Sequence, residues 1–296
     1  MYKSFAVISA FICDLWECEF LNKSSNSAIS KIPELKRAHD TIVSILDEHR
    51  KPSTKELAED LYPLLEVSFP WNELKKKGKL PSYFLEHYKS RLKTEENYYG
   101  SIFEIKMASF CLFSDYNLDF LEDYADPNKQ IDFTLRIGTQ SNIFAVECTS
   151  RRMTNNLTSK KLIQTIKEKS KKFNSASIKA LSGKSKDEIK GYFLVIDITR
   201  PDYSTPLVLE NLTDLFKKVE SSLFDGVTLV WTEDILDGDN HSLRPKSENI
   251  GFSVQFTPKV AIEIHFTNDG TVLFMRNYIE PEPKITSWGP EEKTNS

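Results

Sequence analysis

The sequence predicts an α/β protein, with a helical N-terminal region, a mixed sheet flanked by helices and a C-terminal β extension. Two observations lead to this prediction. Apolar residues recur at helical spacing up to about residue 95, and helix and strand candidates alternate from Tyr98 onward. We therefore expect a helical region over residues 1–95, an α/β domain with its β extension over 96–280, and a disordered tail over 281–296.

The N-terminal region contains three helix candidates. The clearest begins with a capping box, in which Ser53 is followed three residues later by Glu56. Pro63 is expected to kink or end this helix early, because proline has no backbone N–H to donate. The other candidates are residues 27–49, interrupted at Pro33, and residues 82–93.

From Tyr98 the candidates follow the order helix, three strands, helix, strand, helix, strand, which predicts a sheet covered on both faces. These elements are residues 98–113, 118–123, 130–137, 142–150, 159–173, 191–199, 208–224 and 226–235. Three further strands form the β extension, and residues 268–270 are expected to turn between the last two. These strands are residues 251–256, 260–266 and 271–279.

The bulk properties exclude several classes of protein. The apolar run from Phe5 to Cys13 is too short for a membrane span, and acidic residues follow it without a signal-peptide cleavage site. The absence of a glycine-rich phosphate loop argues against an NTPase or a dinucleotide enzyme. The cysteines form neither a disulfide framework nor a zinc-ligand pattern, so we expect a soluble, cytoplasmic protein. They are Cys13, Cys18, Cys111 and Cys148.

Positive charge is concentrated in residues 151–190. This segment holds twelve basic and three acidic residues, a net charge of +9, whereas the whole chain carries −4. A basic segment on an acidic body is typical of a chain that presents one side to a polyanion. A solvated, lysine-rich helix and loop would give the same pattern.

Two neighbouring strands are expected to bring a pair of carboxylates together. In residues 130–137 and 142–150, apolar side chains alternate with polar ones. A four-residue connection pairs Ile137 with Asn142, so Asp132 lies opposite Glu147 while the apolar side chains share the other face. A register shifted by one residue would mix the two faces.

Two carboxylates about 5 Å apart repel each other by roughly 3 kcal/mol at an effective dielectric constant near 20. A shared proton, a basic partner or a divalent cation must offset this repulsion. An oxygen-only ligand set suits Mg²⁺ or Mn²⁺. The alternative is a structural polar face in which the carboxylates pair with Arg136 or Arg151.

The order of these motifs resembles the PD-(D/E)XK nuclease superfamily, whose members have the restriction-endonuclease-like fold. The matching residues are Glu104 in a helix, Asp132 in one strand and Glu147 in the next. The resemblance covers roughly residues 98–235. It implies a metal-dependent nuclease that hydrolyses phosphodiester bonds in DNA, for example in restriction or phage defence.

The resemblance also implies roles for individual residues. Asp132, Glu147 and the carbonyl of Cys148 would hold the metal, and Glu104 would bind a second metal or orient the first. The usual lysine of the motif is replaced by Thr149. In this superfamily the following helix sometimes supplies the lysine, and Lys169 is the first choice because it flanks the apolar stripe of that helix, with Lys172 second.

The expected partner is nucleic acid, in particular double-stranded DNA, without a membrane. A homodimer is expected if both strands of a duplex are cut. The residues that would contact phosphates are Arg151, Arg152, Lys160, Lys161 and Lys172. Thr149 leaves a second hypothesis open, in which the same fold is catalytically inactive and binds nucleic acid or a protein partner.

Overall fold

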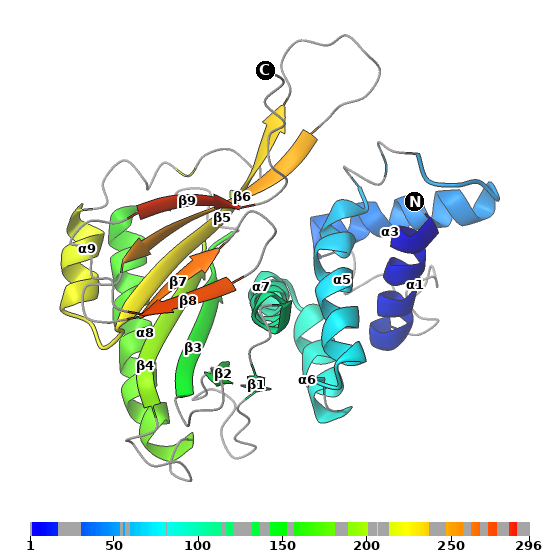
Figure 1. The fold of residues 1–296 in the computed structure, drawn as a ribbon. Coiled ribbons are helices and arrows are strands. Elements are labelled where there is room, and N and C mark those ends of the chain that lie inside the picture. The colour runs from blue at the N-terminus through cyan, green and yellow to red at the C-terminus, as the bar shows by residue number, and fades with distance from the viewer. Residues whose placement is uncertain are drawn as a thin grey trace. The chain divides into compact units, whose positions relative to one another are not determined.

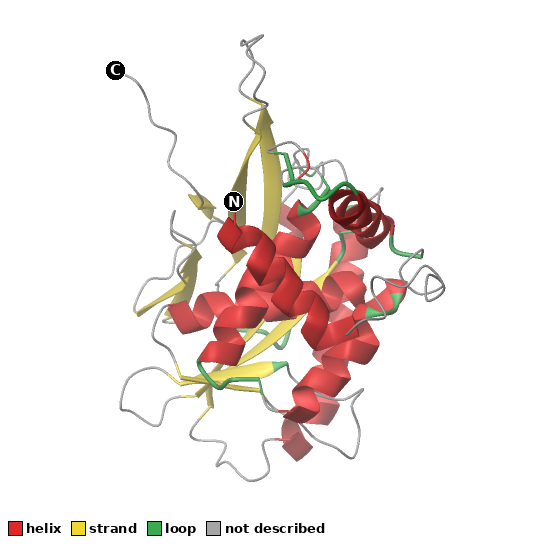
Figure 2. Cartoon of the chain, turned by 90° about the vertical axis from the view of Figure 1, so that its right-hand side faces the viewer, coloured by secondary structure: helices red, strands yellow, loops and turns green. Residues whose placement is uncertain are grey.

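The computed structural model describes most of the chain, and Figure 2 colours its helices red and its strands yellow. The described residues form two compact units, Met1–Ser109 with Leu236–Ser247 and Phe110–Ile235 with Glu248–Ser296. The units divide between Ser109 and Phe110, inside helix α7, and not at the predicted position after residue 95. The structure describes residues 2–16, 31–53, 56, 60–80, 82–113, 117–120, 132–136, 143–152, 157–180, 189–200, 206, 213–236, 247–256, 262–266, 272–276 and 284–288.

Helices form the described part of the first unit (Figure 1). Trp71 is fully buried and packs edge-on against Phe11 and Tyr88, so one ring joins three helices. Trp71 belongs to α5, Phe11 to α1 and Tyr88 to α6. The helices of this unit are α1 (Tyr2–Trp16), α3 (Pro33–Asp47), α5 (Tyr62–Lys76), α6 (Ser82–Leu92) and the larger part of α7 (Glu95–Phe113).

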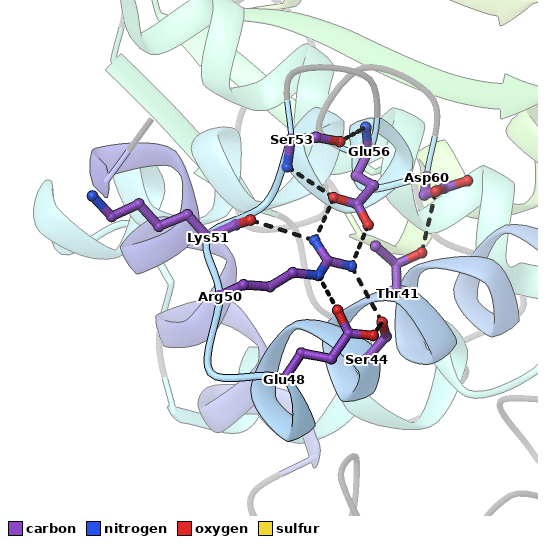
Figure 3. Close-up of polar contacts among 8 residues, drawn as sticks. All are labelled: Thr41, Ser44, Glu48, Arg50, Lys51, Ser53, Glu56 and Asp60. Atoms are coloured by element: carbon purple, nitrogen blue, oxygen red, sulfur yellow. Dashed lines mark hydrogen bonds and ion pairs between the residues drawn. The ribbon is translucent and has the colours of Figure 1, made fainter.

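The predicted capping box is present (Figure 3). The backbone N–H of Ser53 donates to Glu56 Oε2 at 2.8 Å, and the backbone N–H of Glu56 donates to Ser53 Oγ at 3.1 Å. The helix expected from Ser53 does not continue through Pro63, because a turn at Asp60 separates the two. Pro63 lies in the first turn of α5, where the missing N–H costs no hydrogen bond.

The second unit is an α/β layer with a mixed sheet flanked by helices, in the strand order β1-β2-β3-β4-β5-β6-β9. Strands β1, β2 and β3 pair antiparallel, and β3, β4 and β5 pair parallel. The bounds of these strands are β1 (Asn117–Phe120), β2 (Phe133–Arg136), β3 (Ile143–Ser150), β4 (Ile189–Asp197) and β5 (Gly226–Leu236).

Helices α8 (Ser159–Ala180) and α9 (Thr213–Glu220) lie side by side against one face of this sheet (Figure 1). Leu162 and Ile166 of α8 and Val219 of α9 are fully buried against the strands. Burial of these branched side chains fixes both helices on the sheet. Among the described helices, none is long and apolar enough to cross a membrane.

The described residues of the β extension form four strands. Strands β7 (Ile262–Phe266) and β8 (Val272–Arg276) pair antiparallel as predicted, and the expected turn over 268–270 lies outside the described residues. Strand β9 (Lys284–Trp288) pairs with β6 (Ser247–Phe256). The prediction of a disordered tail is therefore wrong for the β9 segment, whose β-branched Ile and Thr suit an extended conformation.

Candidate active site

Strands β2 and β3 pair in the register that their apolar pattern predicts. Phe133 lies opposite Val146, and the four pairs of this ladder run without a shift. Asp132 directly precedes β2, and Glu147 is the next residue along β3, so continuation of the ladder brings the two carboxylates to the same end. Phe133 and Val146 are buried, as expected for the apolar face.

Asp132 is held against β3 by its side chain. Its Oδ2 accepts a hydrogen bond from the backbone N–H of Cys148, with 2.5 Å between the two atoms. Because Cys148 directly follows Glu147, this bond ties Asp132 to the strand position predicted for the carboxylate pair. Asp132 itself has intermediate exposure.

Glu147 meets the amino group of Lys169. Lys169 Nζ lies 2.5 Å from Glu147 Oε1, and the Glu147 residue is only 1% exposed. A buried carboxylate needs such a partner, because desolvation strongly disfavours an isolated charge. Lys169 is therefore the basic partner that can offset the repulsion between the carboxylates of Asp132 and Glu147. The lysine comes from α8, the helix from which the sequence predicted it.

The N-terminal half of α8 positions Lys169. Thr158 caps the helix, since its Oγ1 accepts from the backbone N–H of Lys161 at 3.3 Å. Arg151 leaves the end of β3 and donates from Nε to Thr165 Oγ1 at 3.0 Å. Thr165 is one helical turn before Lys169, so this bond fixes α8 near the site.

The two residues after Glu147 divide between the faces of β3. Cys148 is 2% exposed and free of disulfides, which fits a packing role for its side chain. Thr149 lies two residues after Glu147, so the two side chains point to the same face of β3, and Thr149 is partly exposed. Its hydroxyl cannot supply a cation, whereas Lys169 places an ammonium next to Glu147.

Glu104 belongs to the first unit and has partners there. Arg91 donates to both of its carboxylate oxygens, at 2.6 Å each, and Tyr88 Oη donates to Oε2 at 3.0 Å. Glu104 is 5% exposed. These bonds account for the burial of the carboxylate, and its metal-related role stays a prediction. The sequence carried no signal for the role of Arg91, because an arginine on a solvated helix face has the same kind of neighbours in the sequence.

The predicted phosphate-contacting residues differ in exposure. Lys160 and Lys161 are exposed in the first turn of α8, and Arg151 is partly exposed. Arg152 is 6% exposed, which suits a structural position better than a contact with a nucleic acid. Lys172 lies in α8, and its side chain is outside the described part of the chain.

A further polar cluster lies around Asp197, at the ends of β3 and β4. Asp197 Oδ2 accepts from Ser150 Oγ at 2.9 Å, and its Oδ1 accepts from the backbone N–H of Thr199 at 3.0 Å. Asp197 is 6% exposed. The carboxylate thus ties together the ends of two parallel strands, which is a structural role.

The donor set suits a hard divalent cation, because Asp132 and Glu147 provide carboxylate oxygens and β3 adds backbone carbonyls. Within the described residues, no three His, Cys, Asp or Glu side chains form a ready ligand cluster, so water and a carbonyl would complete the shell. The chain matches no protein-family model, no curated protein and no solved structure.

Proposed function

We propose that the second unit is a metal-dependent nuclease that hydrolyses phosphodiester bonds in DNA, on a restriction-endonuclease-like core. The observation that carries this proposal is the contact of 2.5 Å between Lys169 Nζ and Glu147 Oε1, beside Asp132. Two carboxylates and one ammonium are the groups that metal-assisted phosphodiester hydrolysis uses. Lys169 would take the part of the lysine that Thr149 replaces.

Asp132, Glu147 and the carbonyl of Cys148 would hold Mg²⁺ or Mn²⁺. The bound cation would supply a water of lowered pKa and neutralise charge on the phosphate. Lys169 would donate a hydrogen bond to a phosphate oxygen and stabilise the negative charge that develops there. Its ammonium can leave Glu147 for the phosphate by rotation of its four-carbon chain.

Arg151, Lys160 and Lys161 would bind phosphates on either side of the scissile bond, so affinity for DNA falls steeply with salt. Cutting both strands of a duplex would take two copies of the site. Free cysteines suit a reducing, cytoplasmic compartment. Among the described residues these are Cys13, Cys111 and Cys148.

The second candidate is an inactive relative that binds nucleic acid or a protein partner without hydrolysis. Thr149 favours it, because the motif lysine is absent from its usual position. The ion pair between Glu147 and Lys169 is compatible with this candidate too, since the two charges stabilise each other without a metal.

Cleavage of supercoiled plasmid in Mg²⁺ or Mn²⁺ tests the proposal. We expect Asp132→Ala, Glu147→Ala and Lys169→Met each to lower the cleavage rate by at least about 100-fold, the usual cost of one group that stabilises transition-state charge. Matched controls are Glu220→Gln and Lys217→Met, which change exposed residues of α9 and should cut at the wild-type rate.

Two results would count against the nuclease. Equal cleavage by wild type and the three site variants would assign the activity to another source. Retardation of DNA by a wild-type protein that does not cut would support the inactive relative instead.

A further inference from the structure

The ion pair between Glu147 and Lys169 involves the same carboxylate that a metal would use. Lys169 Nζ lies 2.5 Å from Glu147 Oε1. Mg²⁺ binds carboxylate oxygens at about 2.1 Å, so an ammonium and a divalent ion at Glu147 would lie within a few ångströms of each other. Two positive charges at this separation repel each other. Lys169 therefore opposes the binding of a second cation at Glu147 while the pair is formed.

Burial makes this opposition strong. The Glu147 side chain is 1% exposed, and Lys169 holds almost all of the exposed surface of the pair, at 21% of its side chain. Salt screens charges poorly in such a place. A buried carboxylate without a partner is also costly, so Glu147 exchanges one cation for another and is not left bare between them.

The backbone of α8 keeps Lys169 within reach of Glu147. Ile166, three residues before Lys169, is fully buried against the strands. Thr165 is 1% exposed and accepts from Arg151 Nε at 3.0 Å, which ties the helix to the end of β3. These contacts fix the helix, so the pair opens by rotation of the flexible Lys169 side chain.

We propose that Lys169 couples the binding of the metal to the binding of a phosphodiester, an inference that rests on the proposed function. A phosphate beside the pair offers the ammonium a second anion. When Lys169 turns to that phosphate, Glu147 Oε1 becomes available to the metal. Metal and nucleic acid then strengthen each other's binding by the same factor, and without nucleic acid Lys169 weakens the binding of metal at Asp132 and Glu147.

This coupling differs from the action of a lysine on the transition state alone. Removal of a lysine of that second kind lowers the cleavage rate and leaves the affinity for metal unchanged. Removal of the Lys169 charge should lower the cleavage rate and raise the affinity for metal. The two effects have opposite signs, so one variant distinguishes the two roles.

Calorimetric titration with Mn²⁺ tests the competition at Glu147, without nucleic acid and at pH 8, where carboxyl groups are ionised. We expect Lys169→Met to bind Mn²⁺ at least about fivefold more tightly than the wild type, because a positive charge beside the ligand oxygens is lost. Lys169→Gln should do the same, and its N–H donor for Glu147 makes it the second variant if Lys169→Met does not fold.

Two further variants are the matched controls for this titration. Lys169→Arg keeps a cation beside Glu147 and should bind Mn²⁺ like the wild type. Lys167→Met removes an exposed lysine from the same helix, two residues before Lys169, and should also bind like the wild type. Asp132→Ala and Glu147→Ala should lose Mn²⁺ binding, which locates the ion at the two carboxylates.

Fluorescence anisotropy of a labelled DNA duplex tests the exchange with phosphate. Binding is measured with and without Ca²⁺, which takes the same kind of oxygen ligands. Ca²⁺ should strengthen DNA binding by the wild type and by Lys167→Met at least about fivefold more than binding by Lys169→Met, because only the first two have the ammonium that the metal releases to a phosphate.

The proposal fails if Lys169→Met and Lys169→Gln bind Mn²⁺ no more tightly than the wild type. It also fails if Ca²⁺ strengthens DNA binding by the same factor in the wild type and Lys169→Met, or if Asp132→Ala and Glu147→Ala bind Mn²⁺ like the wild type. Failure of the nuclease alone looks different. The wild type then leaves plasmid intact, while the Mn²⁺ affinities of the wild type and Lys169→Met still differ.

Discussion

Two glutamates that the sequence assigned to catalysis meet their cations in different ways. In the first unit, Arg91 donates to both oxygens of Glu104 at 2.6 Å, and Tyr88 adds a third bond. In the second unit, Lys169 contacts one oxygen of Glu147 at 2.5 Å. A guanidinium is a rigid fork that matches a carboxylate, whereas an ammonium is a mobile point charge.

This difference separates a structural carboxylate from one that can change partners. To bind a metal, Glu104 would have to give up two charge-assisted bonds from Arg91, which are strong because both partners are ionised and the contact is bidentate. Glu147 would have to release one ammonium on a flexible chain. The comparison therefore favours Glu147 as the working group and Glu104 as a support of the first unit.

The largest effect on stability should come from breaking the pair in the first unit. Arg91→Met leaves Glu104 buried without its two guanidinium bonds, and we expect a loss of about 4 kcal/mol in the free energy of unfolding. Lys169→Met should cost less, about 2 kcal/mol, because Lys169 makes one contact with Glu147 where Arg91 makes two with Glu104. Urea denaturation at neutral pH measures both.

Arg37→Met is the control for that comparison, since Arg37 is an exposed residue of α3 and its loss should change stability by no more than about 0.5 kcal/mol. If Arg91→Met behaves like this control, the forked contact contributes nothing to folding. Glu104 would then no longer differ from Glu147 as a structural carboxylate.

Exchanging the two cations sharpens the comparison. Arg91→Lys should still cost about 2 kcal/mol, because an ammonium cannot make the forked contact with Glu104. Lys169→Arg should change stability by less than about 1 kcal/mol, because a cation remains beside Glu147, yet lower plasmid cleavage at least about tenfold. Wild-type cleavage by Lys169→Arg would show that the shape of the cation at this position is unimportant.

The sequence was sufficient to predict the structure where the spacing of apolar side chains decides which face of a strand or helix is buried. Alternation in the strands fixed which residues of β2 and β3 face the core, and with it the register that brings Asp132 to Glu147. The apolar stripe of α8 located Lys169 beside the sheet. Leu162 and Ile166 of this helix are fully buried against the strands.

The sequence was insufficient where the partner is distant along the chain. Arg91 has no local pattern that distinguishes it from a solvated arginine, and the bond from Arg151 to Thr165 depends on how α8 leaves β3. Strand β9 was missed because only its pairing with β6 makes a short polar segment a strand. Tertiary contacts decide all three cases.

The smallest expected effect on stability concerns a third ion pair, between Arg50 and Glu56 in the first unit (Figure 3). Arg50 donates to both oxygens of Glu56, and this bond, more than any other contact, lowers the Glu56 pKa from 4.5 to about 2. A depressed carboxyl pKa stabilises the fold above pH 4.5, and that contribution is lost as pH falls toward 2. Glu56→Gln keeps an acceptor for the Ser53 N–H but removes the charge.

The melting temperature of wild type should therefore exceed that of Glu56→Gln by a small margin at pH 7, and the margin should close between pH 4.5 and 2. Salt should narrow this margin at neutral pH as well, because the network is partly exposed, with the Arg50 side chain 33% and the Glu56 side chain 22% accessible. A margin independent of pH would mean that Glu56 acts through its hydrogen bonds alone. Arg50 and Arg91 would then make the same bidentate contact, but the contact of Arg50 would stabilise the fold by hydrogen bonding and not by its charge.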